Sequence, residues 1–160
     1  MKIEITYKEM PKLRPISIPT KGKSFFGGIY VWMFKVRTWE VVDDWVYEID
    51  GVEYVIRTGF IFDGASIPRS FWHILNPIGI LLIPGLIHDW AYKYAGLERV
   101  TKITTRKIHS ETISMNQADS DSLFYQTAVS INGLKFVNWL AYKSLRLFGF
   151  FAWNKHRKGG

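Results

Sequence analysis

The sequence predicts an α+β fold, with an N-terminal antiparallel sheet followed by three or four helices that pack on one face of it. One observation is the segment 45–57, WVYEIDGVEYVIR, whose alternating apolar residues and central Asp-Gly are typical of a β-hairpin. A second is that segments 85–96, 116–132 and 134–148 carry helical apolar spacing or glycine stops. A third is size, since 160 residues of which 48% are hydrophobic can bury one core.

The composition limits the class of protein. The chain has no cysteine, which excludes disulfides and thiolate metal sites, and its aromatic fraction of 16% argues against disorder. Its first residues lack the apolar stretch of a signal peptide, and the apolar segment 74–87 is too short and too interrupted by prolines to span a membrane. We therefore expect a soluble protein without a membrane partner, with a single domain over residues 1–153 and a flexible basic tail over residues 154–160.

The hairpin within residues 45–57 fixes the register of the predicted sheet. Asp50 and Gly51 supply the two positive-φ positions of a type I′ turn. The resulting register forms one apolar face from the pairs Ile49–Val52, Tyr47–Tyr54 and Trp45–Ile56. Upstream, residues 28–42 are rich in β-branched and aromatic residues, which predicts one or two further strands.

Helices are predicted in the second half of the chain. Ser66 can cap a short helix that has Pro68 in its first turn. Residues 85–96 are expected to form a longer helix that Gly96 ends.

Two more helices complete the predicted fold. The helix at residues 116–132 has Ser114 and Gln117 placed as a capping box and Gly133 as its stop. The helix at residues 134–148 has an apolar face that could lie on a membrane surface, but we expect it to pack in the core because a domain of this size must cover its helices. The residues of that face are Phe136, Trp139, Leu140, Lys143 and Leu147.

Polar residues in apolar settings mark a candidate site. Asp63 interrupts the apolar motif GFIFDGASIPRSFW, and Asp121 extends the apolar stripe of its helix by one turn. His88 and Asp89 are adjacent on another helix. Because lone carboxylates are rarely buried without a partner, we expect these four groups to converge in one cleft where the sheet meets the helices.

Three motifs in order, GFIFDGASIPRSFW, IHDWAY and a helix with D-x-x-F, resemble the phage protein family known as domain of unknown function 1353. The similarity covers about residues 50–150 and departs from the family's first motif at Phe62, where the family has a threonine. It implies a phage or prophage gene, and hence a product found in the host bacterial cytoplasm or in the virion, but no particular activity. The motif residues that it places in this chain are Asp63, Ser66, Arg69, His88, Asp89 and Asp121.

The candidate catalytic and metal-ligating residues are Asp63, His88, Asp89 and Asp121. Their nitrogen and oxygen donors suit a divalent metal such as Zn, Mn or Mg, which would activate a water for hydrolysis of a phosphodiester or amide bond. In a metal-free site, His88 would be a general base oriented by Asp63 or Asp121. A third interpretation is a buried salt-bridge network without catalysis, in which Arg69 and His88 pair with these aspartates.

The segment 98–110 joins the helix of His88 to the helix of Asp121, and it is basic. A connection of this length can act as a lid, and its cations would neutralise a phosphate-bearing ligand. The alternative is a solvated β-hairpin without a ligand. The residues that we expect to bind a ligand are Ser66, Arg69, Tyr92, Arg106 and Lys107.

The sequence leaves three classes of function, of which a small hydrolase is favoured. The second is a virion or tail-associated structural or assembly protein, whose partners would be phage tail or virion proteins. The third is a nucleotide-binding or sequestering module, for which the formal net charge of +7 would attract an acidic ligand.

Overall fold

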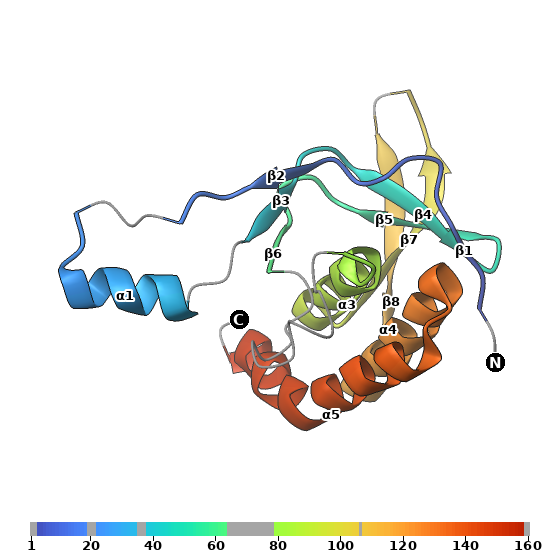
Figure 1. Cartoon of the computed structure of the whole chain (residues 1–160). Helices are drawn as coiled ribbons and strands as arrows, with labels where there is room; N and C mark the ends of the chain where they lie inside the picture. Colours follow the sequence, from blue (N-terminus) through green and yellow to red (C-terminus); the bar gives the residue numbers. More distant parts are fainter. Residues whose placement is uncertain (1–2, 19–21, 35–37, 64–78, 106, 159–160) are drawn as a thin grey trace.

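The computed structural model of the chain describes residues 3–18, 22–34, 38–63, 79–105 and 107–158. This part contains two antiparallel sheets, and three helices lie together on one side of the larger sheet (Figure 1). These helices are α3 (Leu82–Tyr94), α4 (Gln117–Asn132) and α5 (Lys135–Lys158). The arrangement confirms the predicted α+β fold.

The larger sheet has the strand order β1-β4-β5-β7-β8, and each neighbouring pair is antiparallel. Its strands are β1 (Ile5–Thr6), β4 (Trp45–Ile49), β5 (Val52–Ile56), β7 (Gly96–Ile103) and β8 (Ile108–Ser114). Strands β4 and β5 form the expected hairpin, because Asp50 and Gly51 have φ values of 49° and 79°. The predicted register is confirmed in the pairs Ile49–Val52, Tyr47–Tyr54 and Trp45–Ile56.

The smaller sheet has the strand order β2-β3-β6, and its last strand leads to the candidate residue Asp63. Its strands are β2 (Leu13–Pro15), β3 (Trp39–Val41) and β6 (Ile61–Phe62). Asp63 directly follows β6, so the end of this short strand determines where its carboxylate lies.

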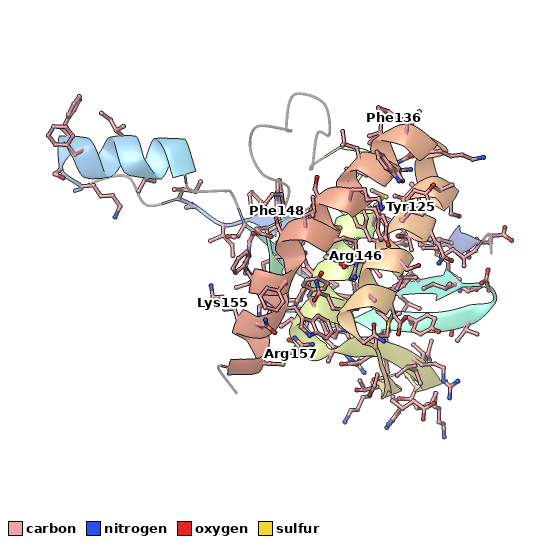
Figure 2. The ribbon with its side chains drawn as sticks, turned by 90° about the horizontal axis from the view of Figure 1, so that it is seen from below. Tyr125, Phe136, Arg146, Phe148, Lys155 and Arg157 are labelled. Atoms are coloured by element: carbon pink, nitrogen blue, oxygen red, sulfur yellow. The ribbon has the colours of Figure 1, made fainter. Side chains whose placement is uncertain are left out.

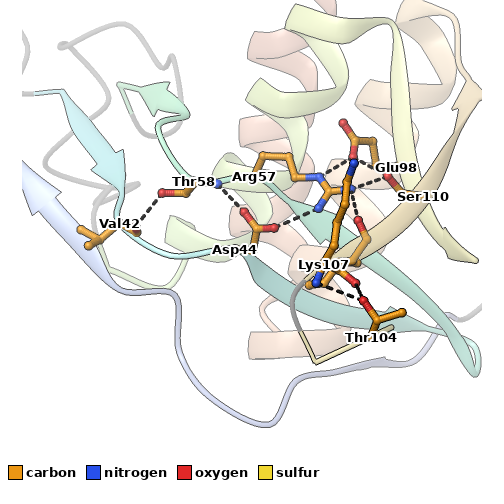
Figure 3. Close-up of polar contacts among 9 residues, drawn as sticks. Val42, Asp44, Arg57, Thr58, Glu98, Thr104, Lys107 and Ser110 are labelled. Carbon is orange, nitrogen blue, oxygen red and sulfur yellow. Dashed lines mark hydrogen bonds and ion pairs between the residues drawn. The ribbon is translucent and has the colours of Figure 1, made fainter. Parts of the chain in front are cut away.

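The basic segment 98–110 is a β-hairpin of the larger sheet. Arg57, directly after β5, ties this hairpin to the preceding one (Figure 3). Its guanidinium pairs with Asp44 at 2.9 Å and with Glu98 at 2.8 Å. At the end of the β7–β8 hairpin, the Thr104 hydroxyl donates to the carbonyl of Lys107 at 2.8 Å. The segment is therefore held to the sheet at its base and closed at its tip.

Residues 28–34, which we expected in a strand, belong to the helix α1 (Phe25–Phe34). The Ser24 hydroxyl accepts a hydrogen bond from the N–H of Gly27 at 3.2 Å, which satisfies a donor of the first turn. The strand expectation is therefore wrong for residues 28–34, although it is right for β3. Figure 1 shows α1 set apart from the sheets and from the other helices.

Helix α3 ends earlier than expected. Ala95 adopts the left-handed conformation, with φ 54°, and forms the C-cap. Gly96 is instead the first residue of β7, where a Cβ would overlap the carbonyl oxygen of Ile113 on β8. Glycine at this position permits the close approach of two strands and is not the helix stop.

Residues adjacent to helix α4 in the sequence cap both of its ends. Its N-cap is Asn116 and not Ser114, because the Asn116 side chain accepts the N–H of Asp119 at 2.9 Å. Gly133, with φ 71°, ends the helix as predicted.

Helix α5 has 24 residues and continues well beyond residue 148, where we expected it to end. The described part of the expected tail, residues 154–158, is helical. Among the described residues, no helix combines the length and the apolar character that crossing a membrane requires.

The face of α5 that packs in the core differs from the expected one. Ala141 and Leu145 are buried against α4. Of the expected residues, Leu140 packs against this cluster, whereas Phe136, Trp139 and Leu147 are exposed. A second and larger core cluster packs the sheets against α3, which thereby connects the sheets to the pair α4–α5.

Candidate functional site

A cavity of about 320 Å³ opens where β6, α3 and α5 meet. Its inner part, the acidic floor, is formed by Asp63, His88 and Asp89. Its exposed edge, the basic rim, is formed by Lys93, Lys155 and His156. The wall between them is mainly apolar and includes Phe60, Phe62, Leu145 and Phe148.

Helix α3 supplies the centre of the site. His88 and Tyr92 are four residues apart, so they share a face of the helix, and their ring centroids are 4.0 Å apart. Asp89 follows His88 in sequence and turns toward the cavity. One helix therefore presents an imidazole, a carboxyl group and a phenol to the same region.

Asp121 lies behind His88 and has no exposed surface. Its Oδ1 accepts hydrogen bonds from His88 Nε2 at 2.9 Å and from the Tyr92 hydroxyl at 2.5 Å, and its Oδ2 accepts one from Arg146 at 3.0 Å. Burial alone would raise the pKa of Asp121, but these three hydrogen bonds outweigh burial and hold that pKa below its ordinary value. Asp121 is therefore a carboxylate whose oxygens are occupied by protein donors.

The imidazole of His88 lies between two carboxyl groups. Its Nδ1 is 3.6 Å from Oδ1 of Asp89, which is longer than a hydrogen bond, while its Nε2 bonds to Asp121. Burial lowers the pKa of His88, but the hydrogen bond to Asp121 and the charges of both aspartates raise it above the ordinary value. The structure thus favours an imidazolium that balances Asp121.

Asp89 is the group of the floor that titrates near neutral pH. Burial raises its pKa to about 7, the negative charge of the neighbouring Asp63 acts in the same direction, and His88 opposes both. Its Oδ2 is buried and has no hydrogen-bond partner within the described part of the chain. A carboxyl group in this position can hold a proton and release it to a bound molecule.

The basic rim gives the cavity entrance a positive charge. Lys93 lies over the ring of Phe60, with Nζ 5.3 Å from the centroid, and Lys155 is exposed on α5. Partial burial lowers the pKa of His156, and the neighbouring cations lower it further. An anionic group entering the cavity would pass the two lysines before it reaches the floor.

Gly149 lets α5 pack against the site. A Cβ at this position would overlap the hydroxyl oxygen of Tyr92, which is the oxygen that bonds to Asp121. Close to this point, Arg157 donates to the carbonyl of Tyr92 and lies over the ring of Trp153, 3.7 Å from its centroid. The last turns of α5 therefore hold α3 in place.

The structure brings together four of the residues singled out from the sequence and places a fifth behind them. Asp63, His88, Asp89 and Tyr92 line the cavity, and Asp121 bonds to two of them from behind. Lys107 lies at the tip of the β7–β8 hairpin and is not among the residues that line the cavity. The other candidates, which lie outside the described residues, are Ser66, Arg69 and Arg106.

Several site residues on α5 were not predicted, and all of them except Arg146 lie beyond residue 148, where the helix was expected to end. Arg146, which Figure 2 labels on α5, lies within the predicted helix and donates a hydrogen bond to Asp121. Gly149 could have been a signal, since glycine inside a helix costs about 1 kcal/mol relative to alanine and needs a reason. Lys155 and His156 fell in the expected tail.

The four-residue metal set does not fit the geometry as a whole. Both oxygens of Asp121 accept hydrogen bonds from protein donors, and Nε2 of His88 is one of those donors. Among the described residues, no group of three or more histidine or acidic side chains is arranged to hold a metal ion. Binding of a divalent metal by the remaining floor groups stays a prediction.

The geometry can now be set beside known proteins. Residues 39–145, which make up more than half of the 160-residue chain, match the family described as "Protein of unknown function (DUF1353)". This chain belongs to that family. No curated protein and no solved structure matches the chain. The acidic floor and Asp121 lie within the matched segment. Arg146, Gly149 and the two rim residues on α5, Lys155 and His156, follow this segment in the sequence.

Proposed function

We propose that this protein is a hydrolase that cleaves an amide bond by general acid–base catalysis from Asp63 and Asp89. The observation that supports this most is the pair of neighbouring carboxyl groups in the cavity, one of which has a pKa of about 7. Two carboxyl groups that cannot both ionise freely can share one proton and then act as acid and base together. Such a pair works near neutral pH without a nucleophilic side chain.

The reaction consumes one water and restores both carboxyl groups. The carboxylate of Asp63 takes a proton from water as the water oxygen attacks the carbonyl carbon, and a tetrahedral intermediate forms. Oδ2 of the neutral Asp89 gives its proton to the amide nitrogen, and the carbon–nitrogen bond breaks. The products are a carboxylic acid and an amine, and transfer of the proton from Asp63 to Asp89 completes the cycle.

His88 holds the acid–base pair in place in this proposal. Its imidazolium form has no lone pair, so it cannot be the general base, and its two nitrogens face Asp89 and Asp121. Asp121 in turn fixes the ring through the 2.9 Å hydrogen bond to Nε2. The buried network and the catalytic pair are thus two parts of one site.

The basic rim supports an anionic substrate. Lys93 and Lys155 lie at the entrance, and a carboxylate on the substrate would be attracted to them while its amide bond reaches the floor. A cavity of about 320 Å³ suits a small molecule or the end of a peptide. We therefore favour short peptides with a free C-terminal carboxylate over phosphodiesters, whose charge the carboxylates of the floor would repel.

The test is isotope incorporation in ¹⁸O-labelled water. Purified protein is incubated with a mixture of short peptides at neutral pH, and mass spectrometry identifies products whose new carboxylate carries one ¹⁸O. We expect Asp89→Asn and Asp63→Asn to lower the rate by at least about a hundredfold, the usual contribution of general acid–base groups. Asp119→Asn is the matched control, because Asp119 is an exposed acid on α4.

The same experiment decides between this function and the others. Full activity in Asp89→Asn would refute the acid–base pair. A parent protein that incorporates no label into any peptide would refute amide hydrolysis. That outcome would direct attention to the assembly and nucleotide-binding alternatives.

A further inference from the structure

Helix α5 carries an exposed apolar face that no described part of the chain covers. We call it the α5 outer face, and its residues are Phe136, Trp139, Leu147, Phe150 and Phe151. Phe136, Leu147 and Phe151 are 72%, 71% and 72% exposed. At about 100° per residue, all five side chains fall within about one third of the helix circumference. Seen from below in Figure 2, α5 faces the viewer, with Phe136 and Lys155 toward its two ends.

The charge around this face has one sign. The 24 residues of α5 include Lys135, Lys143 and Lys155 but no acidic residue. Lys143 lies within the face, and its Nζ is 5.7 Å from the ring centroid of Trp139. The surface is therefore both aromatic and cationic along the whole helix.

We propose that the α5 outer face docks on an anionic lipid surface, with the helix axis parallel to the membrane. A helix with an aromatic and aliphatic face beside lysines binds at the lipid–water interface, because its rings enter the acyl boundary while the ammonium groups contact anionic headgroups. α5 fits this interface and not a bilayer-spanning position, since its charges break the apolar length that crossing requires.

A lipid surface fits this face better than a second copy of the chain. Two copies of the α5 outer face would bring their lysines toward each other, and like charges across an interface oppose association. The opposite side of α5, which contains Leu145 and Gly149, packs against the other helices and Tyr92. Docking through the outer face would leave those contacts intact. Leu147 and Lys143 of this face do not line the cavity, so docking can be tested separately from the proposed hydrolysis.

Co-sedimentation with vesicles tests the proposal on the full chain. One set of vesicles contains phosphatidylcholine alone, and the other contains equal parts of phosphatidylcholine and phosphatidylglycerol. Leu147→Ser removes an exposed apolar side chain from the face, and Ile103→Ser, on the β7–β8 hairpin, is its matched control. Lys143→Gln removes a charge from the face, and Lys102→Gln removes the same charge from β7.

We expect the parent to bind the anionic vesicles and not the neutral ones. Leu147→Ser should lower the partition coefficient about tenfold, since a leucine loses its apolar burial, and Lys143→Gln should lower it about fivefold. Ile103→Ser and Lys102→Gln should stay within about twofold of the parent. Circular dichroism and thermal melting confirm that each variant is folded.

Three results would overturn the proposal. The first is absence of parent binding to anionic vesicles. The second is an equal loss in Lys143→Gln and Lys102→Gln, which would mean that net charge and not this face drives binding. The third is a concentration-dependent dimer in analytical ultracentrifugation that Leu147→Ser abolishes, which would assign the face to self-association.

Discussion

Replacing Asp89 with asparagine should make the protein more stable at pH 8 while it removes the proposed activity. Asp89 is largely buried, with 14% of its side chain exposed, and it lies beside another carboxyl group. Ionising it in the folded protein therefore costs free energy that the unfolded chain does not incur. An asparagine of the same shape carries no charge and avoids this cost.

The size of the effect follows from the pKa of Asp89, which rises from 3.8 to about 7 on folding. Well below pH 3.8 the group is protonated in both states, so it contributes no pH dependence. Between pH 4 and pH 7 only the unfolded chain releases the proton, and folding stability falls as the pH rises. At about 1.4 kcal/mol per pKa unit, a pKa that rises from 3.8 to about 7 makes the full loss about 4 kcal/mol above pH 7.

The assay is urea unfolding followed by tryptophan fluorescence at pH 4.5, 6 and 8. We expect the free energies of unfolding of parent and Asp89→Asn to diverge as the pH rises, with the variant more stable by about 4 kcal/mol at pH 8. Asp119→Asn, an exposed substitution, should stay within about 0.5 kcal/mol of the parent. Parallel curves for parent and Asp89→Asn across this range would refute a raised pKa at Asp89.

Three further predictions test the surroundings of the acidic floor. Asp121→Asn should destabilise the protein by about 3–5 kcal/mol in urea unfolding at pH 7, because His88 and Arg146 lose the buried charge that they share; a change below about 0.5 kcal/mol would contradict this. Gly149→Ala should lower the free energy of unfolding by about 1–3 kcal/mol, since the added Cβ overlaps the Tyr92 hydroxyl. In a double-mutant cycle, the same substitution made in Tyr92→Phe should cost much less, and an equal cost in both backgrounds would show that the overlap is unimportant. If the proposed hydrolysis holds, Lys155→Gln should raise KM for peptides with a free carboxylate about two- to fivefold at unchanged kcat, whereas C-terminally amidated peptides should show no change.

Local signals in the sequence were sufficient for the hairpin but not for its neighbours. Asp50 and Gly51 determine a turn type by themselves, so the pairing of β4 with β5 could be predicted residue by residue. The segment 28–34 has the composition of a strand, yet it is helical, because β propensity depends on finding a strand partner and Ser24 offers a helix cap instead. Composition alone does not reveal whether a segment will find a strand partner or form a capped helix.

The candidate site could be predicted from its carboxylates but not from its cations. A buried aspartate requires a partner, and this requirement predicted that Asp121 and His88 would converge with the other two candidate aspartates. It could not single out Arg146, because several arginines are available in the chain and only tertiary packing selects one. Gly149 lies in the same region, and tertiary packing is needed to show that it serves the contact with Tyr92 and does not end the helix.

The family match ends at residue 145, so it includes the acidic floor of the cavity but not the rim residues on α5. Asp63, His88, Asp89 and Asp121 all lie within residues 39–145, so the acidic floor belongs to the DUF1353 segment. Lys155 and His156 come from the later turns of α5, as does the glycine that admits Tyr92. If catalysis resides in the floor, the later turns of α5 control which charged molecules reach it. The same helix carries the α5 outer face, so substrate access and attachment to a surface would both depend on α5.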